Sequence, residues 1–193
     1  MKILQKNEKV LRQIAHEVHI HDIKTTKIKK VLEDMSRALK SQDDGVAIAA
    51  PQIGSPLRIF IVSGKIFAKD FAKNREARLL SQNKATSSEV SVPDNLGGDV
   101  RKKNKDLVFI NPKISKHSSE KEWMPEGCLS VRWLYGKTFR SKKVMLGAYD
   151  ENGKKFTRGA SGLLAQIFQH ETDHLNGILF IDHAKDIKEE LPK

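Results

Sequence analysis

Two histidines and a glutamate near the C-terminal end of the chain have the spacing of a metal site. His170 and His174 stand four residues apart, and Glu171 directly follows the first. On an α-helix, positions i and i+4 lie on the same face, so both imidazoles can reach one metal ion. Glu171 is rotated by about 100° around such a helix, so it flanks the metal and can take the proton of a bound water. The same pattern also fits two surface histidines on a polar helix.

A catalytic metal centre needs a third protein ligand and an open coordination position. The candidates are the lone cysteine Cys128, a late carboxylate (Glu189 or Glu190) and one of the other histidines. Helical metalloproteases use a downstream Glu or His, but Glu189 and Glu190 lie in a polar tail. Cys128 stands in a Glu-Gly-Cys-Leu stretch among apolar residues, and a thiolate there would bind Zn²⁺ or Fe²⁺ well.

The composition indicates one globular domain spanning residues 1–193. Hydrophobic residues make up 38% of the chain and charged residues 31%. No apolar run approaches the roughly 18 residues that a transmembrane helix needs, so we expect no membrane partner. The first residues carry no apolar signal core, which favours a cytoplasmic protein.

The net charge of +11 favours anionic partners such as RNA or the ribosome. The lysines are scattered, however, and the chain has only two Trp and two Tyr, a poor supply for a nucleic-acid stacking platform. We therefore expect weak ribosome association through a basic surface and no specific DNA partner. A basic RNA-binding protein with a structural metal site is an alternative to an enzyme.

The elements before residue 64 frame a small apolar stretch. Apolar residues repeat at helical spacing over 26–40, which predicts a helix capped by Thr25 or Thr26. Residues 45–48 follow as a candidate edge strand whose small side chains allow close approach of an extended ligand. Gln52 is the only polar side chain of this stretch, and beside a metal it can polarise a carbonyl. A buried strand is predicted at 57–62.

The second half of the chain leads to the histidines. Residues 64–106 are predicted to be a partly mobile insertion, rich in polar residues over 81–106. The elements expected after it are strands at 107–111 and 113–118, a hairpin of 144–150 and 154–158 around Asn152-Gly153, a helix from Ser161 through His174 to Gly177, a short strand at 178–181, and a polar, peripheral tail at 182–193.

Three motifs in this order resemble those of the peptide deformylase family, G-φ-G-φ-A-A-x-Q, E-G-C-φ-S and Q-H-E-x-D-H-φ-x-G, where φ is hydrophobic. The matching stretches are Gly45-Val46-Ala47-Ile48-Ala49-Ala50-Pro51-Gln52, Glu126-Gly127-Cys128-Leu129-Ser130, and Gln169 through Gly177. The resemblance covers most of the chain outside 64–106. It implies an α+β fold with mostly antiparallel sheets around a central helix that carries the His-Glu-x-x-His motif.

The resemblance also implies a reaction. The substrate would be the N-formylmethionine of nascent polypeptides, from which formate is released. Cys128, His170 and His174 would bind one divalent metal ion, natively Fe²⁺ and replaceable by Ni²⁺, Co²⁺ or Zn²⁺. Glu171 would be the general base and acid. Gln52 and the backbone N–H of Leu129 would hold the oxyanion. Such an enzyme could act in the bacterial cytoplasm or in an organelle, and the lack of a visible transit peptide favours the bacterial cytoplasm.

A methionine pocket can be inferred around the helix that carries the histidines. Leu163, Gln166 and Ile167 precede His170 by seven, four and three positions, so they share its face. Val46 and Met124 could complete the pocket, although ordinary core packing explains each of these residues as well. Gly45, Val46 and Ala47 would pair with the substrate backbone.

The chain departs from the family pattern at several positions. Ala47 replaces a glycine of the first motif, Gln166 is polar where an apolar wall is expected, and Arg132-Trp133 replaces a Pro-Gly type of turn. These differences bear on substrate preference and turnover more than on metal binding. A zinc endopeptidase using Glu189 or Glu190 is the alternative enzyme.

Overall fold

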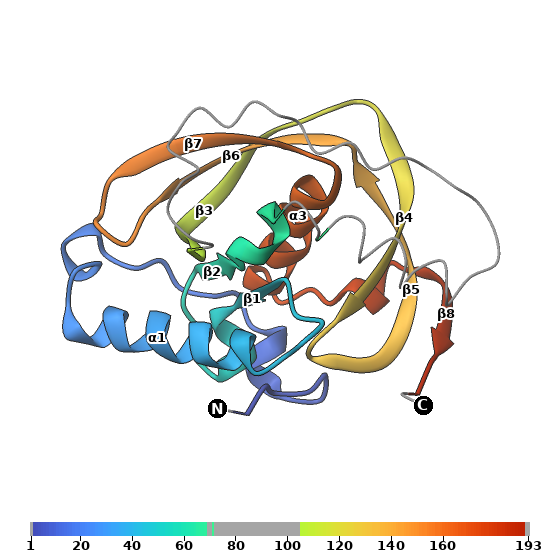
Figure 1. Cartoon of the computed structure of the whole chain (residues 1–193), viewed down its shortest axis with the longest axis horizontal. Coiled ribbons are helices and arrows are strands. Elements are labelled where there is room, and N and C mark those ends of the chain that lie inside the picture. The colour runs from blue at the N-terminus through green and yellow to red at the C-terminus, as the bar shows by residue number, and fades with distance from the viewer. Residues whose placement is uncertain (1, 69–70, 72–104, 192–193) are drawn as a thin grey trace.

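The computed structural model describes residues 2–68, 71 and 105–191 of the chain, and Figure 1 shows its elements. Two sheets form the frame, and all their strand pairs are antiparallel. The five-stranded sheet has the order β1-β2-β3-β6-β7. Its strands are β1 (Ala47–Ala49), β2 (Ile59–Val62), β3 (Leu107–His117), β6 (Lys143–Tyr149) and β7 (Lys155–Ser161). The predicted α+β class with antiparallel sheets is confirmed.

The second sheet has three strands in the order β4-β5-β8. They are β4 (Lys121–Cys128), β5 (Val131–Ser141) and β8 (Lys185–Glu189). Short 3-10 helices connect the larger elements of the described chain. These are η1 (Lys9–Arg12), η2 (Ile20–Asp22), η3 (Ala50–Ile53), η4 (Gly64–Phe67) and η5 (Phe180–Asp182). Within the described ranges, no helix is long and apolar enough to cross a membrane.

Two α-helices, α1 (Thr26–Lys40) and α3 (Gly162–Leu175), pack on opposite faces of the five-stranded sheet. Strand β2 shows why. Phe60 and Val62 join the buried cluster under α3, while Ile59 and Ile61 join the cluster under α1. Successive residues of a strand point to opposite faces, so β2 is buried on both faces, which explains the unbroken apolar sequence of Ile59–Val62 within the buried strand predicted at 57–62.

Helix α1 begins and ends where its apolar periodicity predicts. The Thr25 hydroxyl caps it by accepting a hydrogen bond from the Ile28 N–H at 3.5 Å. Its buried residues, Ile28, Met35, Ala38 and Leu39, form one stripe. The chain then turns through residues 41–46 into β1, which lies at the edge of its sheet as predicted.

Strand β3 replaces the two strands predicted at 107–111 and 113–118. It pairs with β6 through a register shift between Ile110 and Lys113. Pro112 lies inside this shift and cannot donate a ladder hydrogen bond, so the irregularity accommodates it without ending the strand. The predicted hairpin follows as β6 and β7, with Gly153 at φ +76° in its turn.

The prediction for the last residues was wrong. Residues 178–181 do not form a strand, and the short helix η5 occupies Phe180–Asp182. The final strand is instead β8, within the tail predicted to be peripheral, and all five of its residues are exposed. It pairs with β5 through its backbone, a contact that needs no apolar face.

Helix α3 follows β7 directly. Ser161 precedes its first residue as predicted, but the Ser161 side chain makes no capping hydrogen bond. Gly177 adopts φ +73° after the helix, as its assignment to the C-terminal cap requires. A Cβ there would lie 2.7 Å from the Arg12 carbonyl oxygen.

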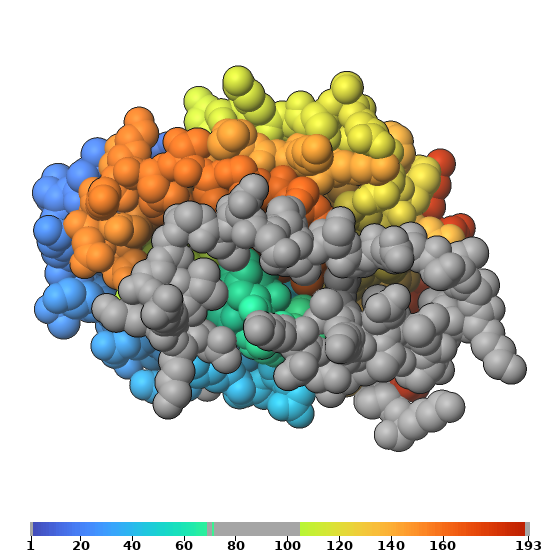
Figure 2. Space-filling model, turned by 45° about the horizontal axis from the view of Figure 1, so that its top comes forward, coloured from blue at the N-terminus to red at the C-terminus, as the bar shows by residue number. Residues whose placement is uncertain are grey.

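Most of the predicted insertion at 64–106 lies outside the described residues. Its described beginning forms η4, and its end precedes β3. Figure 2 shows that the green segment after β1 reaches the surface between the orange strands and the blue helix α1.

Candidate metal centre and active site

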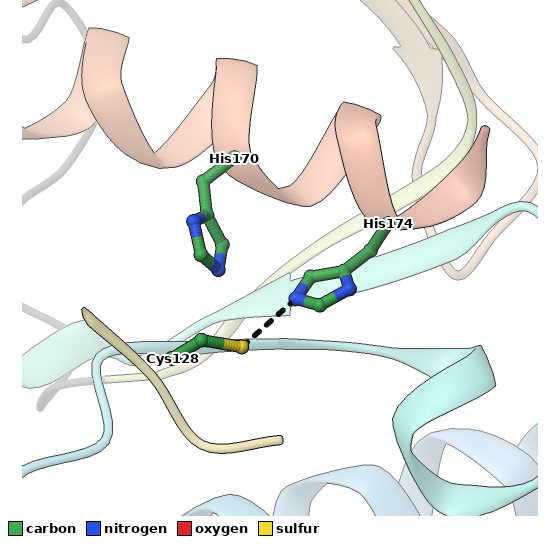
Figure 3. A group of neighbouring side chains, drawn as sticks. All are labelled: Cys128, His170 and His174. Carbon is green, nitrogen blue, oxygen red and sulfur yellow. Dashed lines mark hydrogen bonds between the residues drawn. The ribbon is translucent and has the colours of Figure 1, made fainter. Parts of the chain in front are cut away.

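The structure brings Cys128, His170 and His174 together. One ligand atom of each lies within 4.8 Å of the other two, and Cys128 Sγ is 3.2 Å from His174 Nε2. Figure 3 shows both imidazole rings pointing from α3 toward the cysteine. A thiolate and two imidazoles are ligands that suit Zn²⁺ and Fe²⁺, so the donor set fits a transition-metal ion with a position left for another ligand.

The end of β4 presents the thiol. Cys128 is its last residue, and the pairing with β5 shifts register between Gly127 and Cys128. Gly127 is required at this point because a Cβ would lie 2.7 Å from the Tyr135 ring. The Ser130 N–H points back toward Cys128 Sγ at 3.4 Å. The Glu-Gly-Cys stretch therefore ends the strand in a tight turn under α3.

Glu126 fixes the ring of His170. Its Oε1 lies 2.6 Å from His170 Nδ1, which leaves Nε2 as the ring nitrogen that could bind a metal ion. Burial lowers the pKa of His170, but the charge of Glu126 and the hydrogen bonds of the ring to Cys128 and Glu126 raise this pKa well above its ordinary value. A carboxylate behind a metal-binding histidine fixes the tautomer and ring orientation.

Glu126 is itself held by buried partners on β5. Arg140 donates to both of its oxygens, from Nε at 3.1 Å and from Nη2 at 2.8 Å. Thr138 donates to Oε2 at 2.6 Å. Burial raises the pKa of Glu126, but His170 and Arg140 lower it by more, so this pKa falls far below its ordinary range. Arg140 also reaches Asp173 on α3 at 2.6 Å.

The surroundings of His174 favour a neutral imidazole, the form that can bind a metal ion. Burial and then the charge of His170 lower the pKa of His174 well below its ordinary value. Its Nδ1 is buried without a hydrogen-bond partner among the described residues. The neutral ring therefore directs Nε2 at the thiol.

Glu171 is a buried carboxyl beside these ligands. It is 3% exposed, and its Oε2 has no hydrogen-bond partner within the described part of the chain. Burial raises the pKa of Glu171 to about 7, against an opposing effect of His170. A carboxyl with a pKa near neutrality can both accept and return a proton.

Gln52 adds a buried polar side chain beside the thiol. Gln52 lies in η3, 1% exposed, and its Oε1 accepts the Ala49 N–H at 2.8 Å. Its amide nitrogen donates to Ser130 Oγ at 3.0 Å and lies 3.6 Å from Cys128 Sγ. Leu129 directly follows Cys128 in the turn. The carbonyl end of Gln52 is thus anchored, and its donor end faces the thiol.

Some of the residues expected in the methionine pocket belong to the buried cluster beside α3, and others lie outside it. Ile167 is buried in the cluster under the five-stranded sheet, and Val46 and Leu163 pack against it. Met124, on β4, is 8% exposed and lies outside that cluster. Gln166 donates to the Pro125 carbonyl at 2.8 Å, which explains a polar residue at this position because its amide ties α3 to β4.

The first residues of the first motif, Gly45 to Ala47, are closely surrounded by other side chains and by β2. A Cβ on Gly45 would lie 2.9 Å from a Leu39 methyl and 3.2 Å from a Leu129 methyl. Ala47 is 6% exposed and pairs with Val62 on β2. The first and second motifs therefore touch at Gly45 and Leu129.

The late carboxylates lie at the end of β8 and just after it, with β5 between them and the strand that carries Cys128. Glu189 pairs with Leu134 in β8 and β5, and the Glu190 N–H donates to the Trp133 carbonyl at 2.8 Å. Among the described residues, the cluster suited to a metal contains Cys128 instead. Sequence reasoning gave no role to Glu126, although its motif was recognised, and it missed Thr138 and Arg140.

Comparisons with known proteins show the family to which the chain belongs. The family model described as polypeptide deformylase matches residues 1–190. The chain is 34% identical over 175 residues to peptide deformylase 2 of Clostridium acetobutylicum, covering 91% of this chain and 89% of that one. It is 33% identical over 181 residues to peptide deformylase 1A, chloroplastic/mitochondrial, of Arabidopsis thaliana, covering 94% of this chain and 60% of that one. The crystal structure of a peptide deformylase from Legionella pneumophila superposes with a TM-score of 0.70, at 30% identity, covering 96% and 86% of the two chains.

The α+β fold and a Cys-His-His cluster suited to a metal place the chain among metalloenzymes. More narrowly, it belongs to the polypeptide deformylase family and removes the N-formyl group from nascent peptides. The endopeptidase alternative is therefore wrong.

Proposed function

We propose that deformylation uses one divalent metal ion held by Cys128, His170 and His174, with Fe²⁺ as the native ion. The convergence of their three ligand atoms within 4.8 Å carries this proposal. The soft thiolate suits Fe²⁺, and Ni²⁺, Co²⁺ or Zn²⁺ can replace it. When bound, the ion polarises the formyl oxygen and acidifies the attacking water. The helix that carries the His-Glu-x-x-His motif is the centre of the catalytic domain.

Glu171 moves the proton in this proposal. Its carboxylate accepts a proton from the water that attacks the formyl carbon. It returns the proton to the amine nitrogen as the C–N bond breaks, so that formate and a free N-terminal amine leave. The burial that raises the pKa of Glu171 to about 7 supports both steps.

Gln52 and Leu129 stabilise the oxyanion. The carbonyl of Gln52 is anchored by Ala49, and one of its N–H groups is held by Ser130 Oγ. The other N–H, on the nitrogen 3.6 Å from Cys128 Sγ, is the one that donates to the oxyanion. The Leu129 N–H is the second donor. Each donor of this kind contributes roughly 3 kcal/mol to the transition state.

The substrate binds along β1. As an edge strand, β1 can accept an extended peptide, and residues Gly45, Val46 and Ala47 pair with its backbone. The methionine side chain contacts the residues proposed for the pocket, which are Val46, Met124, Leu163, Gln166 and Ile167. Gln166 supports the pocket wall through its hydrogen bond to Pro125.

The enzyme acts in the bacterial cytoplasm and associates weakly with the ribosome. Two exposed aromatic side chains support a contact with RNA. Trp123 is 45% exposed and Phe139 51%, with ring centroids 5.2 Å apart. Lys185 Nζ lies 4.7 Å from the Trp123 ring. Aromatic rings beside lysines on a sheet can stack bases and contact phosphates.

The metal assignment is tested with Cys128→Ala. Protein is purified anaerobically and its bound metal is measured by elemental analysis. Wild type should hold one ion per chain, and Cys128→Ala should lose it because two imidazoles alone bind weakly. Full retention of metal by Cys128→Ala would sink the proposal. Ser130→Ala, which removes a neighbouring hydroxyl but no ligand, is the matched control.

A further inference from the structure

Arg132 bridges two segments that meet at the active site. It lies in β5, four residues after Cys128. Its Nη1 donates to Asp44 Oδ2 at 2.6 Å and its Nη2 to Asp44 Oδ1 at 3.2 Å. Nη2 also donates to Gln42 Oε1. The Arg132 side chain is only 21% exposed. A two-pronged guanidinium–carboxylate pair fixes geometry as well as charge.

The pair is ionised at neutral pH. Burial raises the pKa of the Asp44 carboxyl, but the hydrogen bond and charge of Arg132 lower it by more, so the pKa lies below its ordinary value. The bridge therefore joins opposite charges under the conditions in which nascent chains are processed.

The bridged segment controls where β1 begins. Gln42 and Asp44 lie between the end of α1 and Gly45, and the Gly45 N–H donates to the Gln42 carbonyl at 3.2 Å. The Val46 carbonyl accepts from Ser63 at 2.8 Å, on the side of β2. Within the described residues no strand pairs with the opposite edge of β1, which makes it the edge that can accept a peptide. Holding residues 42–44 thus sets the position of the strand at its free edge.

Strained backbone accompanies this bridge. Trp133, the next residue, has φ +67°, a left-handed conformation that is unfavourable for a residue with a side chain. The Arg132 guanidinium lies 5.4 Å from the Trp133 ring centroid. Arg132 and Trp133 line a surface groove of about 390 Å³ with residues 41–44. The groove begins beside the start of the first motif.

We propose that Arg132 is a positioning residue for residues 45–47, the segment that pairs with the substrate backbone. Through Asp44 and Gln42 it holds this segment in the position where it can pair with the peptide. It also shapes the groove for the substrate residues that follow the methionine. This inference rests on the proposed pairing of residues 45–47 with substrate. Arg132 touches none of the reacting atoms, so its loss acts on binding of peptides that extend past the first residue.

The test compares Arg132→Ala with wild type on formyl-Met-Ala-Ser and on formyl-Met amide. KM for the longer substrate should rise about ten-fold, the loss expected for one charged hydrogen bond, while kcat stays within about two-fold. KM for formyl-Met amide should change less. The double variant Arg132→Asp with Asp44→Arg should recover most of the loss. Lys105→Ala, which breaks the Lys105–Glu151 pair at 2.6 Å, is the matched control.

Hydrogen exchange of the amides over 42–49 gives a second readout that does not depend on activity. Exchange should be faster in Arg132→Ala and unchanged in Lys105→Ala. A folded Arg132→Ala variant with wild-type KM for both substrates, or with unchanged exchange over 42–49, would overturn the inference. Absence of formate release by metal-loaded wild type would instead contradict the proposed function, and exchange would still decide whether Arg132 holds the strand.

Discussion

At the scale of single residues, the site depends on a buried chain of charges behind the proposed metal ligands. His170 is held by Glu126, Glu126 by Arg140, and Arg140 also contacts Asp173 on the ligand-bearing helix. Arg140 and Glu126 are 6% and 7% exposed. Such a network orients the imidazole, and each member is costly to remove because its partners remain buried and charged.

Arg140→Ala should therefore destabilise the protein by about 3–5 kcal/mol. Urea unfolding of the metal-free protein would measure this. Arg37→Ala, which breaks an exposed pair with Asp34 at 3.8 Å, should change the free energy of unfolding by less than about 1 kcal/mol. Equal effects of the two substitutions would contradict the importance assigned to the buried network.

The ligands were easier to predict than their supports. The helical spacing of His170 and His174 identifies them as candidate ligands, and it places Glu171 beside them. Cys128 was chosen among several candidates by its surroundings and by the family resemblance. Thr138 and Arg140 carry no local signal, because they reach Glu126 only through the register of β4 on β5. The hydrogen bond from Gln166 to the Pro125 carbonyl could not be predicted either, because helix periodicity does not show which residue of another element lies opposite.

At the scale of elements, the predictable parts were those with strong local patterns. Helix α1 has an apolar stripe and a cap, and β6–β7 has an Asn-Gly turn. The hairpin β4–β5 was missed because Pro125 and Gly127 suggest a break. In the structure β4 is an edge strand, where proline is tolerated. Strand β8 was missed because its five residues are all exposed, so they show no alternating apolar pattern.

The contact between the α1–β1 turn and β5 should make stability depend on pH. The pKa of Asp44 is lower in the folded protein than the unfolded value of about 3.9. The Asp44–Arg132 pair therefore stabilises fully above that unfolded value, and its contribution is lost as pH falls through the lower folded pKa.

Asp44→Asn should reduce the free energy of unfolding at pH 7, with the difference from wild type shrinking below about pH 4. Urea unfolding across this range measures it. The half-exposed position of Asp44 keeps the effect modest. A difference that grows on acidification would contradict a folded-state pKa of Asp44 below its unfolded value.

At the scale of the whole molecule, the five-stranded sheet separates two buried clusters, and α3 lies between this sheet and β4–β5 (Figure 1). Gln169 joins α3 to the second sheet through Ser141, whose N–H and carbonyl it binds at 3.0 Å each. The fold class followed from resemblance. The pairing of the sheets could not be predicted from the chain, because it depends on contacts between residues distant in sequence.

The net positive charge of the whole molecule should favour binding of RNA. A single-stranded RNA should bind with an affinity that falls steeply with salt, and Trp123→Ala should weaken it about ten-fold by removing one stacking ring. Fluorescence anisotropy of a labelled oligonucleotide measures this. Ile14→Ala, at another exposed apolar residue (70% exposed), should leave binding unchanged, and both variants should keep wild-type formate release. RNA binding insensitive to Trp123→Ala would remove the support for this surface.

Formate release from formyl-Met-Ala-Ser by anaerobically purified, Fe²⁺- or Ni²⁺-loaded protein tests the catalytic account most directly. Wild type should release formate, and Glu171→Gln should lose at least about 100-fold in kcat because it can neither accept nor return the proton. Its bound metal should stay at one ion per chain. An inactive loaded wild type, or a Glu171→Gln variant with wild-type kcat, would contradict the account.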